Sequence, residues 1–284
     1  MTLGTEPDAP DEPENDDREQ LETGPLETGW RGATPVTDSL QRRFVMGFAE
    51  WMEGSGLAAG HPTLRTDHVV AIDEHSPHLL LNSAILLHPP TPDDAAQVLA
   101  DLVGFYAQGE GGPYCVFSPW PAEIPDFAVG GHPPVMLRMP SPGPGAPPDG
   151  LDVVEITTPE LLAEYERVLV DGFPLETLQP WVRGNALHPS SLHLPGMRMF
   201  VGLVNGTGVC GASSIVAHGV NHVEWVATVA EARGHGYGEA ITWAATLADP
   251  AVPAMLVATD MGRPVYERMG YAVLDRWTFL MRDR

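Results

Sequence analysis

The distribution of apolar and polar residues predicts alternating helices and strands in the first half of the chain. Apolar positions with helical spacing begin near residues 42–51, and the continuous apolar run at 79–87 predicts a buried strand. Thr91, followed by a proline and two aspartates, suits the N-cap of the helix that comes next. Short apolar runs at 113–117 and 134–139 predict two more strands, so this half has α/β character.

The second half shows the same alternation more clearly. The dipeptide Asn205-Gly206 lies between two apolar runs and predicts a hairpin, because both residues tolerate positive φ. The predicted elements are, in chain order, a strand at 152–156, a helix at 158–170, hairpin strands at 199–204 and 208–216, a strand at 223–229, a helix at 236–248, a strand at 254–258, a short helix at 264–269, and closing strands at 271–274 and 277–281. This order predicts an α/β fold class with a mixed sheet.

Changes in composition divide the chain into four segments. Residues 1–38 are acidic and poor in apolar positions, so we expect a disordered tail. Residues 39–139 form an N-terminal α/β domain. The segment 140–150 is rich in proline and glycine and is predicted to be a linker. Residues 151–284 then form the C-terminal domain.

The composition excludes several classes of partner. The formal net charge is −23 and all 15 basic residues are arginines, which disfavours binding to nucleic acid or anionic lipid. No apolar run is long enough for a membrane helix, and the acidic start does not resemble a signal peptide. The two cysteines, Cys115 and Cys210, do not indicate a disulfide framework. We therefore expect a cytoplasmic protein without a nucleic-acid or membrane partner.

The most informative stretch is the glycine-rich turn at 233–238, which joins a predicted strand directly to a predicted helix. The first turn of a helix has free amide groups and the positive end of the dipole, and together these favour anions. Glycines at 234, 236 and 238 allow close approach of a phosphate, and Arg233 adds a positive charge. The spacing G-x-G-x-G is not the dinucleotide fingerprint, and a P-loop is excluded because the chain has no lysine. A turn that serves only the architecture is the alternative.

Arg233, Gly236 and Gly238 also resemble the [QR]-x-x-G-x-[GA] signature of the GCN5-related N-acetyltransferase (GNAT) superfamily. The segment at 263–271 resembles a second motif of that superfamily, and Gly211 resembles the glycine of its third strand. The resemblance covers about 130 residues. It implies a GNAT acyltransferase fold for the C-terminal domain. We consider the smaller N-terminal domain a candidate degenerate copy, in which the glycine signature is missing.

The resemblance also implies which residues contact an acyl-CoA co-substrate, most often acetyl-CoA. Backbone groups of the fourth strand would bind the pantetheine arm, and backbone amides of the turn would bind the pyrophosphate. The implied residues are Ala227, Thr228 and Val229 for pantetheine, and Arg233, Gly234, His235, Gly236, Tyr237, Gly238 and Glu239 for pyrophosphate.

The resemblance places Tyr266 next to the leaving thiolate as general acid. Glu224 on the fourth strand is the candidate base, with His222 as the alternative and a purely structural carboxylate also open. One departure is Thr259, which stands where the superfamily often has asparagine. The region of Trp181, His188 and His193 is where the superfamily builds its acceptor pocket, although loop packing explains these residues equally well.

The sequence therefore predicts an enzyme that transfers an acyl group from acyl-CoA to a primary amine by direct attack. The alternative is a module that binds acyl-CoA without turnover, as a sensor or interaction partner. No H-E-x-x-H or compact cysteine–histidine set is present, so we expect no metal. A homodimer is left open.

Overall fold

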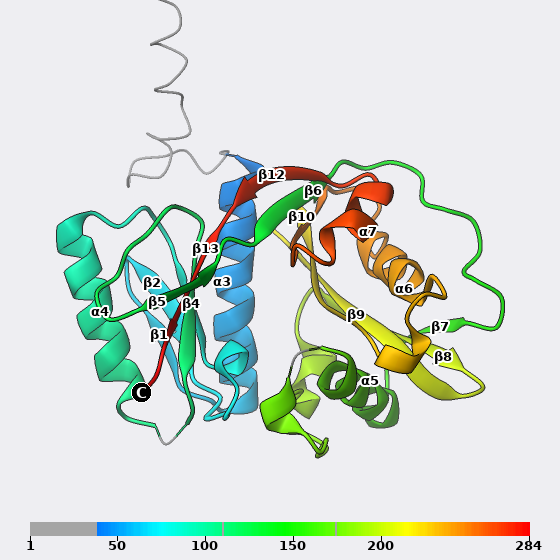
Figure 1. The fold of residues 1–284 in the computed structure, drawn as a ribbon, viewed down its shortest axis with the longest axis horizontal. Coiled ribbons are helices and arrows are strands. Elements are labelled where there is room, and N and C mark those ends of the chain that lie inside the picture. Colours follow the sequence, from blue (N-terminus) through cyan, green and yellow to red (C-terminus); the bar gives the residue numbers. More distant parts are fainter. Residues whose placement is uncertain (1–38, 110, 174) are drawn as a thin grey trace, which may run out of the picture. The chain divides into compact units, whose positions relative to one another are not determined.

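The computed structural model describes residues 39–109, 111–173 and 175–284, and residues 40–284 form a single compact unit. The expected acidic tail at 1–38 therefore lies outside the described residues. Within them the strands form two mixed sheets, which confirms the predicted α/β class (Figure 1). None of the described helices is long and apolar enough to cross a membrane.

The first sheet has six strands, and its parallel pair, β3 and β4, is joined by helix α4 (Pro92–Tyr106). The strands lie in the spatial order β1 (Thr63–Arg65), β2 (Val69–Ile72), β3 (Ser83–Leu86), β4 (Tyr114–Ser118), β13 (Thr278–Arg282) and β5 (Ala128–Gly131). The predicted strand at 79–87 is thus shorter than expected. A 3₁₀ turn, η1 (Leu79–Leu81), replaces its first residues, because the buried Asn82 side chain binds the backbone of Ser76 and Pro113 there.

The second sheet has seven strands and carries the predicted site. The strands lie in the spatial order β12 (Ala272–Arg276), β6 (Pro134–Arg138), β11 (Ala254–Val257), β10 (Val220–Thr228), β9 (Thr207–Ala217), β8 (Met197–Val204) and β7 (Asp152–Glu155). Its helical elements are α5 (Pro159–Gly172), η2 (Glu176–Leu178), η3 (Pro189–His193), η4 (Ala230–Ala232), α6 (Tyr237–Thr246) and α7 (Arg263–Arg268). The predicted hairpin is present, with β8 and β9 joined at Asn205 and Gly206.

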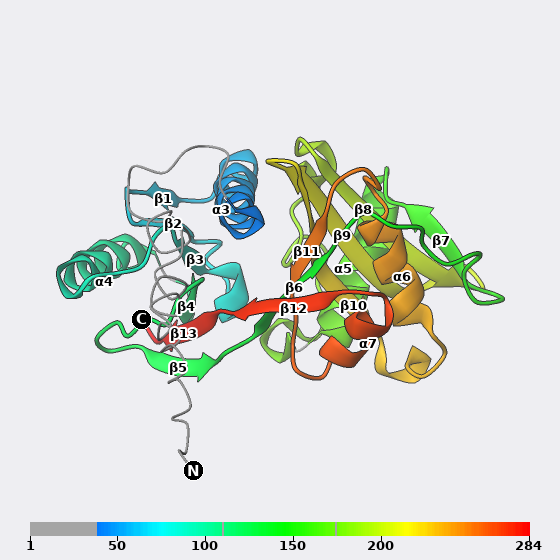
Figure 2. The same ribbon diagram turned by 90° about the horizontal axis from the view of Figure 1, so that it is seen from above.

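The two halves of the chain exchange one strand each. β6 precedes the proposed linker but pairs between β11 and β12, and β13 leaves the second sheet to pair between β4 and β5. The expectation that both closing strands belong to one sheet is therefore wrong. Figures 1 and 2 show β12 and β13 as one red ribbon that passes from sheet to sheet. Strand propensity cannot reveal this exchange, because an apolar strand fits either sheet.

The first sheet repeats the strand pattern of the second. Antiparallel pairings, two in the first sheet and three in the second, lead in each to a parallel pair joined by a helix, and the exchanged strand then lies between the last two strands. This topology supports the expected degenerate copy. The copy has Thr91 with a full capping box at the head of α4 in place of a glycine turn, and no described helix between β4 and β5.

Helix α3 (Leu40–Ala59) packs against strands of both sheets. Trp277, which joins β12 to β13, is fully buried, and its ring lies 5.4 Å from the ring of Phe44 and 6.0 Å from that of Phe48. Phe117 of β4 completes this aromatic cluster. Because aromatic side chains bury large apolar areas, the cluster stabilises the point where the chain crosses between sheets.

Candidate functional site

Strands β10 and β11 separate and leave one edge of each unpaired. They pair only at Asn221 with Ala254 and at His222 with Met255, although β10 continues to Thr228. On its other edge β10 contains a bulge between Glu224 and Ala227, where Trp225 has a φ of 51°. Positive φ is rare for a bulky residue, and bulges occur often beside active sites. The backbone of β10 is thus distorted next to the opening.

The glycine turn leads from β10 into α6, as predicted. Gly234 and Gly236 have φ values of 83° and 79°, which a side chain would strain. Gly236 is the N-cap of α6 and offers no side chain to the first-turn amides. In contrast, helices α4 and α5 are capped by the hydroxyls of Thr91 and Thr158. Among these three helices, only α6 has an N-terminus whose free amides can bind an anion.

Arg233 has a role that the sequence did not suggest. Its Nε donates to the Thr228 carbonyl at 3.1 Å, and its Nη2 donates to the Gly172 carbonyl at 2.9 Å. The guanidinium therefore ties the turn to β10 and to the end of α5. A direct contact of Arg233 with phosphate stays a prediction, and positioning the turn is the role that the hydrogen bonds support.

Glu224 and Tyr266 lie near each other beside the opening of the sheet. Burial raises the pKa of Glu224 to about 8, and its Oε1 is buried without a hydrogen-bond partner among the described residues. Burial, and secondarily the Glu224 charge, raises the pKa of Tyr266 to about 12. Tyr266 lies on α7, and within the described part of the chain its hydroxyl makes no hydrogen bond. Neither the Glu224 Oε1 nor the Tyr266 hydroxyl is thus engaged by another described residue.

His222, the alternative base, is placed elsewhere. Its ring stacks on Phe44 of α3 with the centroids 4.6 Å apart, and an added Cβ at Gly47 would clash with it. Burial lowers the pKa of His222 to about 3, and neither ring nitrogen has a partner in the described part of the chain. The imidazole is therefore a neutral packing group between α3 and β10.

Tyr165 was missed by the sequence analysis. This fully buried residue of α5 donates its hydroxyl to the Trp225 carbonyl at 2.9 Å and so fixes the bulge. Its ring packs on Gly211 of β9, where any Cβ would clash. The glycine was noticed only as part of a family resemblance, and its physical reason is the space that Tyr165 needs.

At the end of β10 and at Val229, which follows it, some backbone groups are hydrogen-bonded and others face the opening. Val229 donates to the Val209 carbonyl at 3.0 Å and accepts from Ala232 at 3.0 Å, so both of its groups are paired. Hydrogen bonding alternates along an antiparallel pair, and Ala227 therefore faces β9 as Val229 does. The amide of Thr228 is left on the open side.

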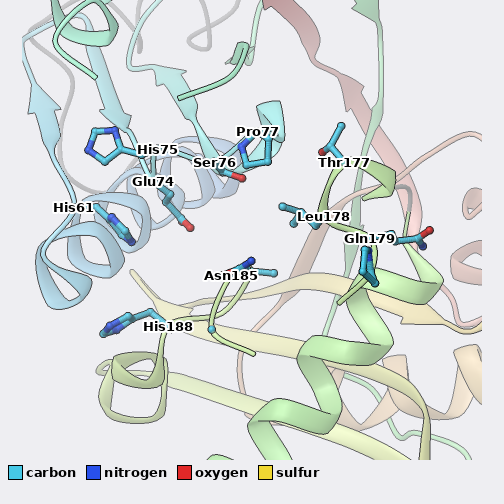
Figure 3. Close-up of a pocket in the computed structure, with 13 residues that line it drawn as sticks. His61, Glu74, His75, Ser76, Pro77, Thr177, Leu178, Gln179, Asn185 and His188 are labelled. Carbon is cyan, nitrogen blue, oxygen red and sulfur yellow. The ribbon is translucent and has the colours of Figure 1, made fainter. Parts of the chain in front are cut away.

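The region predicted to hold the acceptor divides into packing and pocket residues. Trp181 packs against a buried cluster, and its Nε1 has no partner within the described chain. His188 lines a pocket of about 470 Å³, whereas His193 does not (Figure 3). Cys115 and Cys210 are free thiols and are buried, in agreement with the absence of a disulfide framework.

One further cluster lies at the head of α4. His68, His88 and Asp94 place one ligand atom each within 4.8 Å of one another, a set that suits a metal ion. Asp94 already closes the capping box with Thr91, and the rings of His68 and His88 contact each other. The Nδ1 of His68 is buried without a hydrogen-bond partner among the described residues, and the expected absence of a metal stays a prediction.

Comparison with known proteins identifies the fold. No protein-family model matches the chain, and no curated protein matches it. Among solved structures, the chain resembles a GCN5-related N-acetyltransferase from Kribbella flavida, with 18% identity and a TM-score of 0.63 over 86% of this chain and 96% of that one.

Two further structures point the same way. A GNAT-family protein from Novosphingobium aromaticivorans shares 16% identity and a TM-score of 0.55 over 87% of this chain and 100% of that one. A tandem GNAT protein from the clavulanic acid biosynthesis pathway shares 12% identity and a TM-score of 0.52 over 87% and 96%. The chain therefore has the GNAT fold, and the expected resemblance is confirmed at the level of fold. The coverage includes both halves, which agrees with a two-domain arrangement of that fold.

Proposed function

We propose that this protein is an N-acyltransferase that uses acyl-CoA, and that the C-terminal half carries the reaction. The observation that supports this most is the N-terminus of α6, which has no side-chain cap, follows a glycine-rich turn and lies next to the opening between β10 and β11. A Cβ at Gly234 would meet no described atom within 4 Å, so space for an anion exists beside the amides. The co-substrate supplies an acyl group activated as a thioester.

The chain would hold acyl-CoA mainly through its backbone. First-turn amides of Tyr237, Gly238 and Glu239, with the amides of the turn before them, would bind the pyrophosphate. The Thr228 amide faces the open side of β10 and is our candidate for the pantetheine contact. Ala227 would shape the channel, and Val229 would act only by fixing the turn.

Glu224 would accept the proton that the attacking amine loses. A base works best when its pKa lies near the working pH, and the raised pKa of about 8 meets this condition. As the N–C bond forms and the C–S bond breaks, the departing thiolate would take a proton from Tyr266. The proton held by Glu224 then restores Tyr266, so protons balance over one cycle.

Calorimetric titration with acetyl-CoA and with CoA tests the proposal. We compare wild-type protein with Gly234→Asp, which adds negative charge to the turn. Gly206→Asp is the matched control, because Gly206 has a φ of 80° and equally open surroundings in a remote hairpin. Binding that Gly234→Asp abolishes and Gly206→Asp retains supports the proposal.

The absence of binding in folded wild-type protein would refute the proposal. Binding without turnover on any primary amine would instead favour the sensor or interaction module.

A further inference from the structure

The pocket that His188 lines is built by both halves of the chain. The pocket of about 470 Å³ is within the range of small-molecule sites. From the N-terminal half come His61 and a segment at 74–77, and from the C-terminal half come residues 177–180, 184–186 and His188. Figure 3 shows Glu74 extending from the N-terminal side with its carboxyl directed toward Leu178 and Asn185.

Glu74 is an acidic residue of the pocket that has no cationic partner there. Among the described residues that line the pocket, it is the sole carboxylate and no arginine is present. It makes no hydrogen bond or ion pair with any described residue. Its neighbour Asp73 is compensated, because Arg284 lies 2.6 Å away and His75 lies 3.4 Å away. Burial and the Asp73 charge raise the pKa of Glu74 to about 8.

The nearby histidines do not supply a cation for Glu74. Burial, together with His188 and His75, lowers the pKa of His61. The Nδ1 of His188 accepts from the Ser190 amide at 3.2 Å, so this nitrogen is already engaged within its own loop. The rings of His61 and His188 lie 6.4 Å apart at the pocket wall. Both rings offer hydrogen-bonding nitrogens at the wall, and neither makes an ion pair with Glu74.

The pocket continues toward the bulge of β10. A narrow cleft of about 50 Å³ shares Glu74, His61 and His188 with the pocket and is also lined by Tyr165 and Trp225. Tyr165 bonds to the Trp225 carbonyl, and Trp225 follows Glu224 directly in the chain. The cleft therefore leads from the pocket to the residue next to the proposed base.

We infer that this pocket binds an acceptor that carries a second cationic group, and that Glu74 binds that group. The class comprises diamines, polyamines and amino sugars, in which one amine is acylated while another is held as an ammonium ion. The inference rests on the proposed function for the transfer itself. It assigns a substrate-binding role to the N-terminal half, in which the N-terminus of α4 is capped by Thr91.

Direct titration with small amines tests this inference. We titrate the full chain with 1,4-diaminobutane, spermidine and n-butylamine in the absence of acyl-CoA. We expect the first two to bind at least tenfold more tightly than n-butylamine, since a hydrogen bond to a charged group discriminates by roughly 10- to 100-fold. Glu74→Gln should remove this preference, and Glu74→Asp should weaken it. Glu176→Gln is the control, because Glu176 is exposed next to the pocket but does not line it.

Equal affinities for the three amines, or a preference that survives Glu74→Gln, would overturn the inference. Urea unfolding of each variant shows whether it is folded, and Glu74→Asp keeps the test valid if Glu74→Gln does not fold. The separate acetyl-CoA titration distinguishes the two claims. Glu74-dependent diamine binding without acetyl-CoA binding refutes the proposed function alone, whereas acetyl-CoA binding without diamine preference refutes this inference alone.

Discussion

Replacing Glu224 with glutamine removes an ionisable group from β10 while preserving its size. In the folded protein, burial raises the pKa of this carboxyl from 4.5 to about 8, so the folded state binds the proton more tightly than the unfolded chain does. The resulting stabilisation is complete below about pH 4.5 and is lost as the pH rises through about 8. Glutamine cannot ionise, and Glu224→Gln should lose this pH dependence.

The magnitude follows from the shift. At about 1.4 kcal/mol per pKa unit, the change from 4.5 to about 8 corresponds to at most roughly 5 kcal/mol. We therefore expect the unfolding free energy of Glu224→Gln to increase relative to that of wild type by several kcal/mol between pH 4.5 and pH 9, because only the wild type loses stability as the carboxyl ionises. Tyr266, whose pKa the Glu224 charge also raises, titrates above this pH range, so the difference reports on Glu224.

Urea unfolding followed by tryptophan fluorescence at several pH values measures this difference. Glu231→Gln is the control, because Glu231 is exposed on η4 and has no burial to lose. A difference between wild type and Glu224→Gln that does not change with pH would refute the assigned burial of the carboxyl. The same variant should lower turnover at least 100-fold, the lower range for general base catalysis. Wild-type turnover should rise with pH up to about 8, because only the ionised carboxyl accepts a proton.

Three further predictions concern other parts of the site and fold. Tyr266→Phe should bind CoA as wild type does and lose turnover at least about tenfold in a thiol-release assay, and unchanged turnover would exclude the acid role. Gly211→Ala should lower the unfolding free energy by about 1–3 kcal/mol, because its Cβ would clash with the Tyr165 ring; Gly54→Ala, where a Cβ meets nothing within 4 Å, is the control. A chain that ends at Arg276 lacks β13, a strand paired on both edges, and should lose cooperative unfolding in circular dichroism. If the truncated chain melted as the wild type does, the exchanged strand β13 would not be needed for stability.

Part of the site was predictable from local sequence. The turn at 233–238 determines its own conformation, because only glycine adopts positive φ at 234 and 236 without strain. Thr91 and Thr158 likewise identify helix starts through hydrogen bonds that span three residues. These features depend on neighbours in the chain, and a sequence displays such neighbours directly.

The remainder depended on contacts between distant residues. The apolar patterns of 134–138 and 278–282 predict strands, but only the tertiary structure shows that the two have exchanged sheets. The neutral packing role of His222 requires Phe44 of another helix, and the support of the β10 bulge requires Tyr165.

The pocket that contains Glu74 shows the same division. The pocket combines residues more than 100 positions apart in the chain, such as Glu74 and His188. No local sequence pattern identifies either residue as part of a pocket. Sequence alone determined the elements and the anion-binding turn, because both arise from short-range sterics and hydrogen bonds. Tertiary structure decided strand partners, burial and the pKa values that follow from burial, because these depend on which distant surfaces exclude water.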